Sequence, residues 1–474
     1  MAARQIRFCT DGWRAVIADD YTFENVRYCA QGWADYLRAH GLAELGCVVG
    51  YDTRSESEDF ASAGSEVLAG NGIKALLCQR SEPTPVISFG IIYRKAAGGV
   101  TITASHNPTI YNGFNVRSEC GGAIDTEVIA ELEGRIAAAQ ALGASAVSRL
   151  PKDEGVRQGL IQLYDSATPY VEQIRELIDW QPIRDAGLKV VHDAMYGAGI
   201  GWFEGLLGGG KTQVIPMGSV RNPCFGGLAP EPIPRSLRPL FDAVRREGAM
   251  VGLATDGDSD RLGACDEHGN IVAPLRVNSL LTLYLLEGRG FRGPIVKTLS
   301  TQVDARPPRP ALRRPGRRDG GRVQVRRARD DGVGRADRRR GERRLRFPQP
   351  HPRARRHRRR AVHPRLYGEN GEDATQLVEY LFEKAGPHYY DWLDIHFPAR
   401  ERDAVVARLR GSRPAKLARE DVAGKKVAGE NVTDGHKLTL ADGFRLLIRF
   451  SGTEPVIRIY AEPTRLDRVQ QDSV

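Results

Sequence analysis

The chain has 474 residues, of which 41% are hydrophobic and 27% charged, and this composition is typical of a globular protein with several domains. No stretch reaches the roughly 20 apolar residues of a membrane span, and residues 1–14 lack the apolar core of a secretory signal, so we expect a cytoplasmic protein without a membrane partner. The seven cysteines include no C-x-x-C pair, which favours reduced thiols over a disulfide framework or a zinc site.

The positive charge of the chain is concentrated in one block. Residues 302–366 contain 24 Arg, no Lys and 6 Asp or Glu, a net +18, so the remaining residues carry −8 of the total of +10. A basic chain would ordinarily indicate a nucleic-acid partner. Because the residues outside the block carry a net negative charge, we expect nucleic acid to be an unlikely partner for the folded part.

From residue 4 to about 295, short apolar runs alternate with amphipathic stretches, a pattern that predicts α/β layers with mostly parallel sheets. CVVGYDT, KALLCQ and GGVTITAS are predicted strands, and residues 60–71 a helix. A second unit begins near residue 169 with strands GLKVVHDA and QVIPM, a helix around 200–207, and MVGLATDGDSD as a strand that runs into an acidic loop. A third has a helix VNSLLTLYLLEG and a strand PIVKTLS, and from about residue 368 a small α+β unit places two strands around a Gly-containing loop. The predicted domains are 1–150, 151–270, 271–375 and 376–474.

The block from Arg306 to Arg365 shows no apolar periodicity of 2 or 3.6 residues and cannot build a core. Three interpretations are open: an arginine-rich arm that folds on RNA, a disordered linker, or a segment translated out of frame. Arginine without lysine, together with Pro, Ala and Gly, is the composition that GC-rich DNA yields in a shifted frame. We therefore favour two compensating frame slips, one near 303–306 and one near 362–366.

The motif T-A-S-H-N-P at residues 103–108 directly follows the predicted strand GGVTIT. A hydroxyl at the end of a strand, beside an imidazole, suits a phosphoryl or acyl acceptor, with Ser105 as nucleophile and His106 orienting it or moving its proton. A simple turn punctuated by Asn-Pro is an equally good interpretation of these six residues alone.

The motif D-G-D-S-D-R places Asp256, Asp258 and Asp260 at alternating positions after a buried strand. Three such carboxylates repel one another unless a cation lies among them, and oxygen ligands suit a hard ion such as Mg²⁺. An EF-hand is the alternative, but it requires glycine where this chain has Arg261, and a helix before the loop.

Two further loops have phosphate-binding patterns. R-F-S-G-T-E-P at residues 449–455, with Arg458 beyond it, offers a guanidinium, two hydroxyls and a glycine backbone, although an ordinary hairpin loop would have the same residues. Residues 205–212 match G-x-x-x-x-G-K-T, but a P-loop requires a preceding strand and a following helix, and the pattern here predicts the reverse.

In order and spacing these motifs resemble the α-D-phosphohexomutases of the bacterial phosphoglucomutase/phosphomannomutase group. The resemblance rests on T-D-G-W-R at residues 10–14, the Ser105 loop, the Asp256 loop and R-F-S-G-T-E-P, and it covers residues 5 to about 300 and about 367 to 462. It implies three mixed-sheet α/β domains and a smaller C-terminal α+β domain around a central cleft. It also implies that hexose 1-phosphate and hexose 6-phosphate are interconverted through a phosphoserine, with hexose 1,6-bisphosphate as intermediate and activator.

The resemblance also implies residue roles. Ser105 would carry the phosphate, and Mg²⁺ would be bound by this phosphoserine and by Asp256, Asp258 and Asp260. The transferred group would lie near Arg14, Arg261 and Lys297. The existing phosphate of the substrate would be bound by Arg449, Ser451, Gly452 and Thr453.

Two departures from the family pattern bear on activity. The family's sugar-reading loop G-E-E-S-G-G is missing, and its expected place lies in the arginine block. When a family-like DNA sequence for this loop is translated in a shifted reading frame, the product differs from residues 340–357 at only one position. Asn115 replaces the usual lysine, a candidate general base, and an amide cannot accept a proton at neutral pH. Without a third-domain core the chain loses apolar burial worth about tens of kcal/mol, so we expect poor folding and low turnover.

The alternative function is an arginine-rich nucleic-acid-binding protein on a mutase-derived scaffold, and a P-loop NTPase ranks third. The sequence does not decide between glucose, mannose and glucosamine phosphates, and it does not indicate an oligomeric state.

Overall fold

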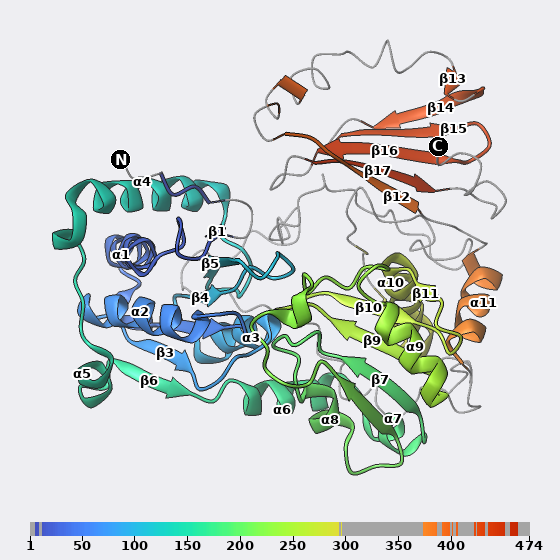
Figure 1. Cartoon of the computed structure of the whole chain (residues 1–474), viewed down its shortest axis with the longest axis horizontal. Helices are drawn as coiled ribbons and strands as arrows, with labels where there is room; N and C mark the ends of the chain where they lie inside the picture. The colour runs from blue at the N-terminus through green and yellow to red at the C-terminus, as the bar shows by residue number, and fades with distance from the viewer. Residues whose placement is uncertain are drawn as a thin grey trace, which may run out of the picture.

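The protein is described from a computed structural model, shown in Figure 1. The description covers residues 5–8, 12–292, 295, 373–385, 391–398, 401, 404–405, 421–422, 424–431, 435–450 and 456–462. The arginine block, the predicted strand PIVKTLS except for Ile295, and four of the candidate site residues, Lys297, Ser451, Gly452 and Thr453, lie outside these ranges.

The first sheet is mixed and has six strands in the order β1-β5-β4-β2-β3-β6. These are β1 (Trp13–Val16), β2 (Cys47–Tyr51), β3 (Ala75–Cys78), β4 (Gly98–Ile102), β5 (Tyr111–Ser118) and β6 (Ile161–Tyr164). Strands β4, β2, β3 and β6 are parallel, whereas β5 runs antiparallel to both β1 and β4. Because β6 pairs with β3, this sheet extends past residue 150, where the sequence predicted the first domain to end.

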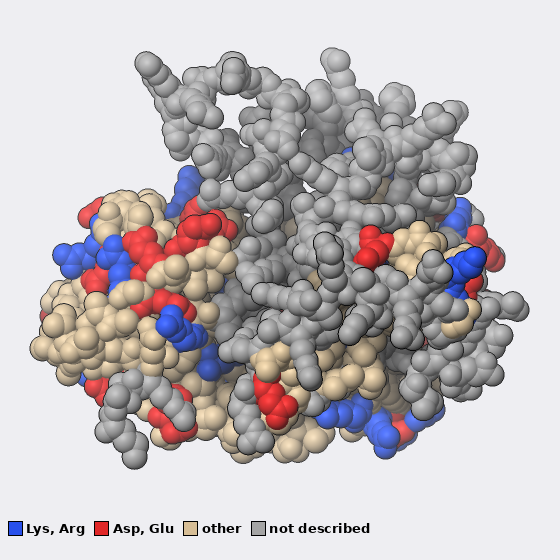
Figure 2. Space-filling view, turned by 90° about the horizontal axis from the view of Figure 1, so that it is seen from above, with Lys and Arg blue, Asp and Glu red and all other residues tan. Residues whose placement is uncertain are grey.

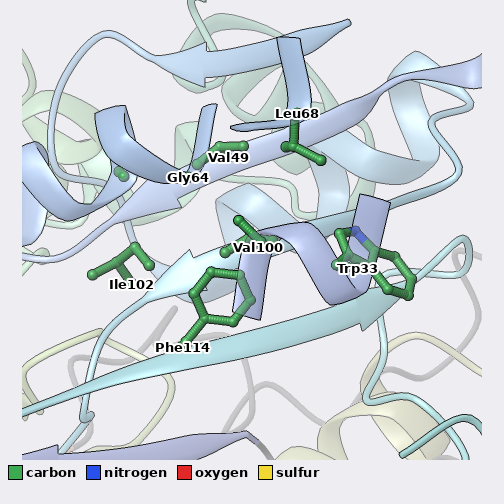
Figure 3. A pocket seen from close by; sticks show the side chains of 9 residues that line it. Trp33, Val49, Gly64, Leu68, Val100, Ile102 and Phe114 are labelled. Carbon is green, nitrogen blue, oxygen red and sulfur yellow. The ribbon is translucent and has the colours of Figure 1, made fainter. Parts of the chain in front are cut away.

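Helices cover the first sheet. The main core lies between the strands and α1 (Phe23–Ala39), α2 (Ser57–Gly70) and α4 (Thr126–Leu142), and a second core joins the sheet to α3 (Thr84–Arg94). The remaining α-helices here are α5 (Lys152–Arg157) and α6 (Ala167–Leu177), whereas α7 (Gln181–Asp185) lies beside the second sheet, where the Arg184 carbonyl accepts from the Thr212 amide (2.8 Å). Figure 3 shows a gap in the main core lined only by apolar side chains and a glycine, among them Trp33, Leu68 and Phe114, so it is a packing feature without groups that could bind a polar ligand.

The second sheet has the order β11-β10-β9-β7-β8. Its strands are β7 (Lys189–Asp193), β8 (Gln213–Met217), β9 (Val251–Thr255), β10 (Leu262–Cys265) and β11 (Ile271–Val272), with β7 parallel to β8 and β9. Helices α8 (Trp202–Leu207) and α9 (Arg238–Glu247) complete this layer, and α9 packs on β7 and β9 around Leu240 and Val244. The predicted strands GLKVVHDA, QVIPM and MVGLAT are confirmed.

The predicted helix VNSLLTLYLLEG is also confirmed, as α10 (Pro274–Leu283) followed by a π-helical turn (Tyr284–Gly288). It packs against α11 (Ala374–Ala385) through Leu283 and Tyr380, and the Tyr380 hydroxyl donates a hydrogen bond to Glu287 (2.8 Å). Helix α11 spans the predicted boundary at residue 375, and these contacts join it to the segment before the arginine block.

The C-terminal unit is an antiparallel sheet with the order β12-β17-β16-β15-β14-β13, seen above the second layer in Figure 1. Its strands are β12 (Asp391–His396), β13 (Asp421–Val422), β14 (Lys425–Asn431), β15 (His436–Leu440), β16 (Arg445–Phe450) and β17 (Val456–Glu462). Strands β16 and β17 form the predicted pair around residues 451–455. Two mixed α/β layers and this sheet confirm the predicted fold class.

On the face in Figure 2, the coloured basic and acidic side chains are interspersed. This agrees with the placement of the positive excess within residues 302–366. Within the described ranges, every helix is too short or too polar to cross a bilayer.

Candidate active site

Ser105 lies in the loop that follows β4, at the carboxyl end of a parallel strand, where ligands commonly bind in open α/β sheets. Its backbone is left-handed, with φ of 51°, an uncommon conformation for a residue with a side chain. The side chain of Thr103 supports this conformation by accepting a hydrogen bond from the Ser105 amide (2.8 Å). Ser105 is buried, so its hydroxyl is held at a defined place.

A buried arginine holds the rest of this loop. The Arg54 guanidinium donates to the carbonyl oxygens of four loop residues, at 2.5 to 3.1 Å: Ser105, Asn107, Pro108 and Tyr111. Its charge is balanced by Asp52, to which Arg54 Nε donates (3.2 Å). Both side chains are almost fully buried, and such a pair survives only when its remaining hydrogen bonds are made.

Asp52 meets that requirement, because its carboxylate accepts four hydrogen bonds. Besides the Arg54 backbone and side chain, the donors are the hydroxyls of Ser57 (2.8 Å) and Thr103 (2.6 Å). Burial raises the pKa of the Asp52 carboxyl and lowers the pKa of Arg54. The four donors on Asp52 and the four carbonyls on Arg54 offset that cost and keep the pair charged.

The aspartate loop follows β9, at the carboxyl end of a strand of the second sheet, and it lies against the serine loop. At Gly257 the two loops are so close that a Cβ would lie 2.5 Å from the Ser105 carbonyl oxygen, so only glycine fits here. The Ser105 hydroxyl donates to Asp256 Oδ2 (2.8 Å) although the two residues are 151 positions apart. The structure thus brings the predicted nucleophile to the predicted metal site.

The three aspartates are arranged to hold a cation. One carboxylate oxygen from each of Asp256, Asp258 and Asp260 can be chosen so that all three lie within 4.8 Å of one another. Asp258 is 2% exposed, and its Oδ1 has no hydrogen-bond partner among the described residues. Burying an unpartnered carboxylate oxygen costs free energy unless the oxygen binds an ion. Burial and the charges of Asp258 and Asp260 raise the pKa of Asp256 well above its usual value, a strain that a divalent cation would relieve.

His106 lies beside the predicted nucleophile, with Nδ1 3.2 Å from Ser105 Oγ. Burial, followed by the charges of Arg261, Arg14, Arg458 and Arg54, lowers the pKa of His106 to about 2, so the imidazole is neutral at physiological pH. Three of these arginines were predicted site residues, and Arg54 was not. Their shared effect on one imidazole shows that cationic charge from both α/β layers and the C-terminal sheet acts at this point.

The arginines come from different elements. Arg14 on β1 donates to Asn107 Oδ1 (2.8 Å) and to the Ala104 carbonyl (3.2 Å), which ties it to the serine loop. Arg261 follows the aspartates, with Nη1 3.5 Å from Glu231 Oε1. Arg449 and Arg458 are cross-strand partners on β16 and β17, so both lie at the end of the hairpin nearest to residues 451–455.

Asn115, the replacement for the family's lysine, is buried in β5. Its side-chain amide donates to the carbonyl oxygens of Thr101 on β4 (3.3 Å) and of Thr103, just after this strand (2.8 Å). It therefore joins two neighbouring strands, whereas His106, the residue predicted to orient Ser105 or to move its proton, lies 3.2 Å from Ser105 Oγ.

Two alternatives from the sequence are removed by the fold. The P-loop pattern at 205–212 lies between helix α8 and strand β8, the reverse of the order that a P-loop requires. The aspartate loop is entered from strand β9 and not from a helix, which excludes an EF-hand.

Sequence reasoning missed Asp52, Arg54 and Thr84. Asp52 and Arg54 follow β2 directly, so polar residues after an apolar strand were the available signal. Thr84 is the first residue of α3, between two prolines, and its hydroxyl donates to Asp258 Oδ2 (2.8 Å). That contact joins residues 174 positions apart, and no local sequence pattern predicts it.

Models of three domains of one family match this chain. Domain I of phosphoglucomutase/phosphomannomutase, an α/β/α domain, matches residues 5–142, domain II matches 168–269, and the C-terminal domain matches 406–471. The matches thus include the serine loop, the aspartate loop and residues 449–458.

Whole-chain comparisons agree with these domain matches. A phosphoglucomutase/phosphomannomutase of Thermococcus kodakarensis is 27% identical over 98% of this chain and 96% of its own. A probable phosphoglucosamine mutase of Thermococcus gammatolerans is 35% identical over 53% of each chain. A crystal structure from Thermus thermophilus, assigned as a phosphomannomutase, superposes with a TM-score of 0.74 at 26% identity, covering 99% of this chain and 97% of the other. With matched motifs on matched domains in the same order, the chain belongs to the phosphoglucomutase/phosphomannomutase family.

Proposed function

We propose that this protein is a phosphohexomutase that interconverts hexose 1-phosphate and hexose 6-phosphate through a phosphorylated Ser105. The observation that carries the proposal is the 2.8 Å contact between the Ser105 hydroxyl and Asp256, which joins a buried nucleophile to a carboxylate triad. Phosphoryl transfer depends mainly on positioning and on stabilising negative charge. This contact supports the positioning of Ser105, and a cation held by the triad would supply the stabilising charge.

In the first half-reaction the bond between phosphorus and Ser105 Oγ breaks and a bond to the free sugar hydroxyl forms, while the proton of that hydroxyl passes to the released Ser105 Oγ. The resulting hexose 1,6-bisphosphate then returns its other phosphate to Ser105. Asp256, Asp258 and Asp260 would hold Mg²⁺ with the phosphoserine, and the bound ion would supply positive charge opposite the transferred group. The neutral His106 imidazole, with Nδ1 3.2 Å from Ser105 Oγ, would help to orient this oxygen by donating a hydrogen bond to it.

The arginines would share the remaining negative charge. Arg14 and Arg261, with Lys297, would lie near the transferred phosphoryl group. Arg449 and Arg458 on the hairpin, with Ser451, Gly452 and Thr453, would bind the phosphate that is not reacting. A clamp on a separate sheet suits a reaction whose intermediate must present each end in turn.

The experiment supplies glucose 1-phosphate, glucose 1,6-bisphosphate and Mg²⁺, measures glucose 6-phosphate, and analyses the Ser105 peptide by mass spectrometry. We expect a phosphate on Ser105 after incubation with the bisphosphate, and none on the Ser105→Ala variant. Mannose and glucosamine phosphates in parallel rank the substrates. An unmodified Ser105 together with undiminished turnover by Ser105→Ala would refute the proposal.

The arginine block affects the expected turnover rate of the protein and not the proposed reaction steps. We expect lower turnover than in an intact family member, because the family's sugar-reading loop coincides with residues 306–365. Sequencing the gene across codons 296–370 tests the two frame slips, and an uninterrupted reading frame identical to the present one would remove them. The nucleic-acid alternative rests on this block alone, whereas the matched relatives are mutases.

A further inference from the structure

We propose that Thr84 is a positioning residue for the metal site: its hydroxyl fixes Asp258 as a one-oxygen ligand and thereby favours a small hard cation over Ca²⁺. The inference rests on the proposed metal at the aspartate triad. It concerns a residue in the first α/β layer that acts on a carboxylate of the second.

The two oxygens of Asp258 have different surroundings. Oδ2 accepts the Thr84 hydroxyl at 2.8 Å, whereas Oδ1 has no partner among the described residues. Both side chains are buried, with 4% of Thr84 and 2% of Asp258 exposed, so water does not easily take the place of either contact. One oxygen is therefore occupied, and the other is left for an ion.

Asp256 shows the same division. Its Oδ1 accepts the backbone amides of Asp260 (3.0 Å) and Arg261 (3.1 Å), and its Oδ2 faces Ser105. Each of the two buried carboxylates thus has one oxygen held by the protein and one directed to the site. The difference is that Asp256 is held by its own loop, whereas Asp258 is held by Thr84 from another sheet layer.

The position of Thr84 is itself well fixed. It begins α3 between Pro83 and Pro85, whose rings restrict the backbone, and its amide donates to the Asp258 carbonyl (2.8 Å). Replacing the side chain leaves this backbone bond in place. A change of the hydroxyl therefore alters the orientation of the carboxylate without separating the two loops.

The number of oxygens that Asp258 offers affects the choice of ion. Mg²⁺ requires near-octahedral coordination and takes one oxygen from a carboxylate, whereas Ca²⁺ is larger and accepts both oxygens of one carboxylate. Without the Thr84 hydroxyl, Asp258 Oδ2 becomes available as a second ligand atom. Loss of such a supporting contact typically costs about 10- to 100-fold in metal affinity.

The test measures Mn²⁺ binding to the full-length chain by electron paramagnetic resonance, with Mg²⁺ and Ca²⁺ as competitors. For Thr84→Val we expect Mn²⁺ affinity to fall about 10-fold and the ratio of Mg²⁺ to Ca²⁺ affinity to fall by a similar factor. Thr84→Ser, which keeps the hydroxyl, should restore both values. Thr84→Ala provides a second variant without the hydroxyl.

Thr53 offers a matched control. Its buried hydroxyl crosses the same pair of layers and donates to the Tyr196 carbonyl, also at 2.8 Å, but it contacts no aspartate of the triad. Thr53→Val should leave both metal values unchanged, even if it lowers the unfolding midpoint as Thr84→Val does. An unchanged Mg²⁺ to Ca²⁺ ratio in Thr84→Val would overturn the role of Thr84. An unmodified chain that binds no Mn²⁺ would instead overturn the metal assignment itself.

Discussion

The two ends of the proposed site are built in different ways. The serine and aspartate loops are held by buried hydrogen bonds between residues 51 to 174 positions apart, and their key side chains, Arg54, Ser105 and Asp256, are almost fully buried. The hairpin of β16 and β17 places Arg449 and Arg458 opposite each other by local strand pairing, and Arg458 is only partly buried. Chemistry at the first end depends on long-range packing, whereas binding at the second depends on a short segment of chain.

This difference predicts where a substitution affects rate, stability or affinity. The largest loss should follow Asp256→Asn, which removes a carboxylate charge at the nucleophile. We expect turnover to fall about 10²- to 10³-fold relative to the unmodified chain, measured as glucose 6-phosphate formation at saturating Mg²⁺. Asp266→Asn is the control, because Asp266 stabilises a turn through the His268 and Asn270 amides. Equal losses in both variants would contradict the special role of Asp256.

Arg54→Met tests whether the buried end depends on its ion pair. Removing the guanidinium leaves Asp52 charged in the interior and frees four carbonyls of the serine loop, so we expect unfolding to become easier by about 3 to 5 kcal/mol. The measurement is urea denaturation followed by circular dichroism. Arg157→Met removes an exposed pair with Glu154, where the side chains are 71% and 36% exposed, and should leave the free energy of unfolding almost unchanged. Similar losses of unfolding free energy in the two variants would contradict the special dependence of the serine loop on its buried ion pair.

His192 makes the stability of the second α/β layer sensitive to pH. Burial lowers its pKa to about 4, below the ordinary value of 6.5, so between these values the unfolded chain binds the proton more readily than the folded chain. Stability should therefore rise as pH increases from about 4 to 6.5, by about 3 kcal/mol in total, and stay level above that range.

Denaturation of the unmodified chain and of His192→Gln across this pH range measures the effect. The slope should be smaller in the variant, and the exposed His268→Gln should keep it. A slope that survives His192→Gln would assign the pH dependence to another group.

The smallest effect is expected at the hairpin. Arg458→Ala should raise the KM for the hexose phosphate about 10-fold, because one charge-assisted contact to phosphate is lost, while the unfolding midpoint barely changes. Arg445, at the other end of the same strand pair, contacts Glu462 at 3.4 Å, and Arg445→Ala should leave KM unchanged. A change in kcat with constant KM would place Arg458 in the chemical step and not in the clamp.

Much of the site could be predicted because its residues follow strands. Ser105, Asp256 and the hairpin around 451–455 all lie next to apolar runs that are easily recognised in the sequence. The order of these motifs along the chain indicated the family. Asp52, Arg54 and Thr84 could not be assigned in this way. Each of these residues acts through contacts with residues far away in the sequence, and a local sequence pattern does not indicate such contacts.

The amino-acid sequence by itself determined the α/β class, the strands and loops that carry the chemistry, and the family. Local periodicity and residue type are sufficient for these, since they depend on neighbours within one strand or turn. The tertiary structure alone decided that Ser105 meets Asp256, that Arg54 supports the serine loop, and that Thr84 occupies one oxygen of Asp258. The physical reason is that each of these contacts joins two elements whose approach is set by the packing of whole sheets and helices.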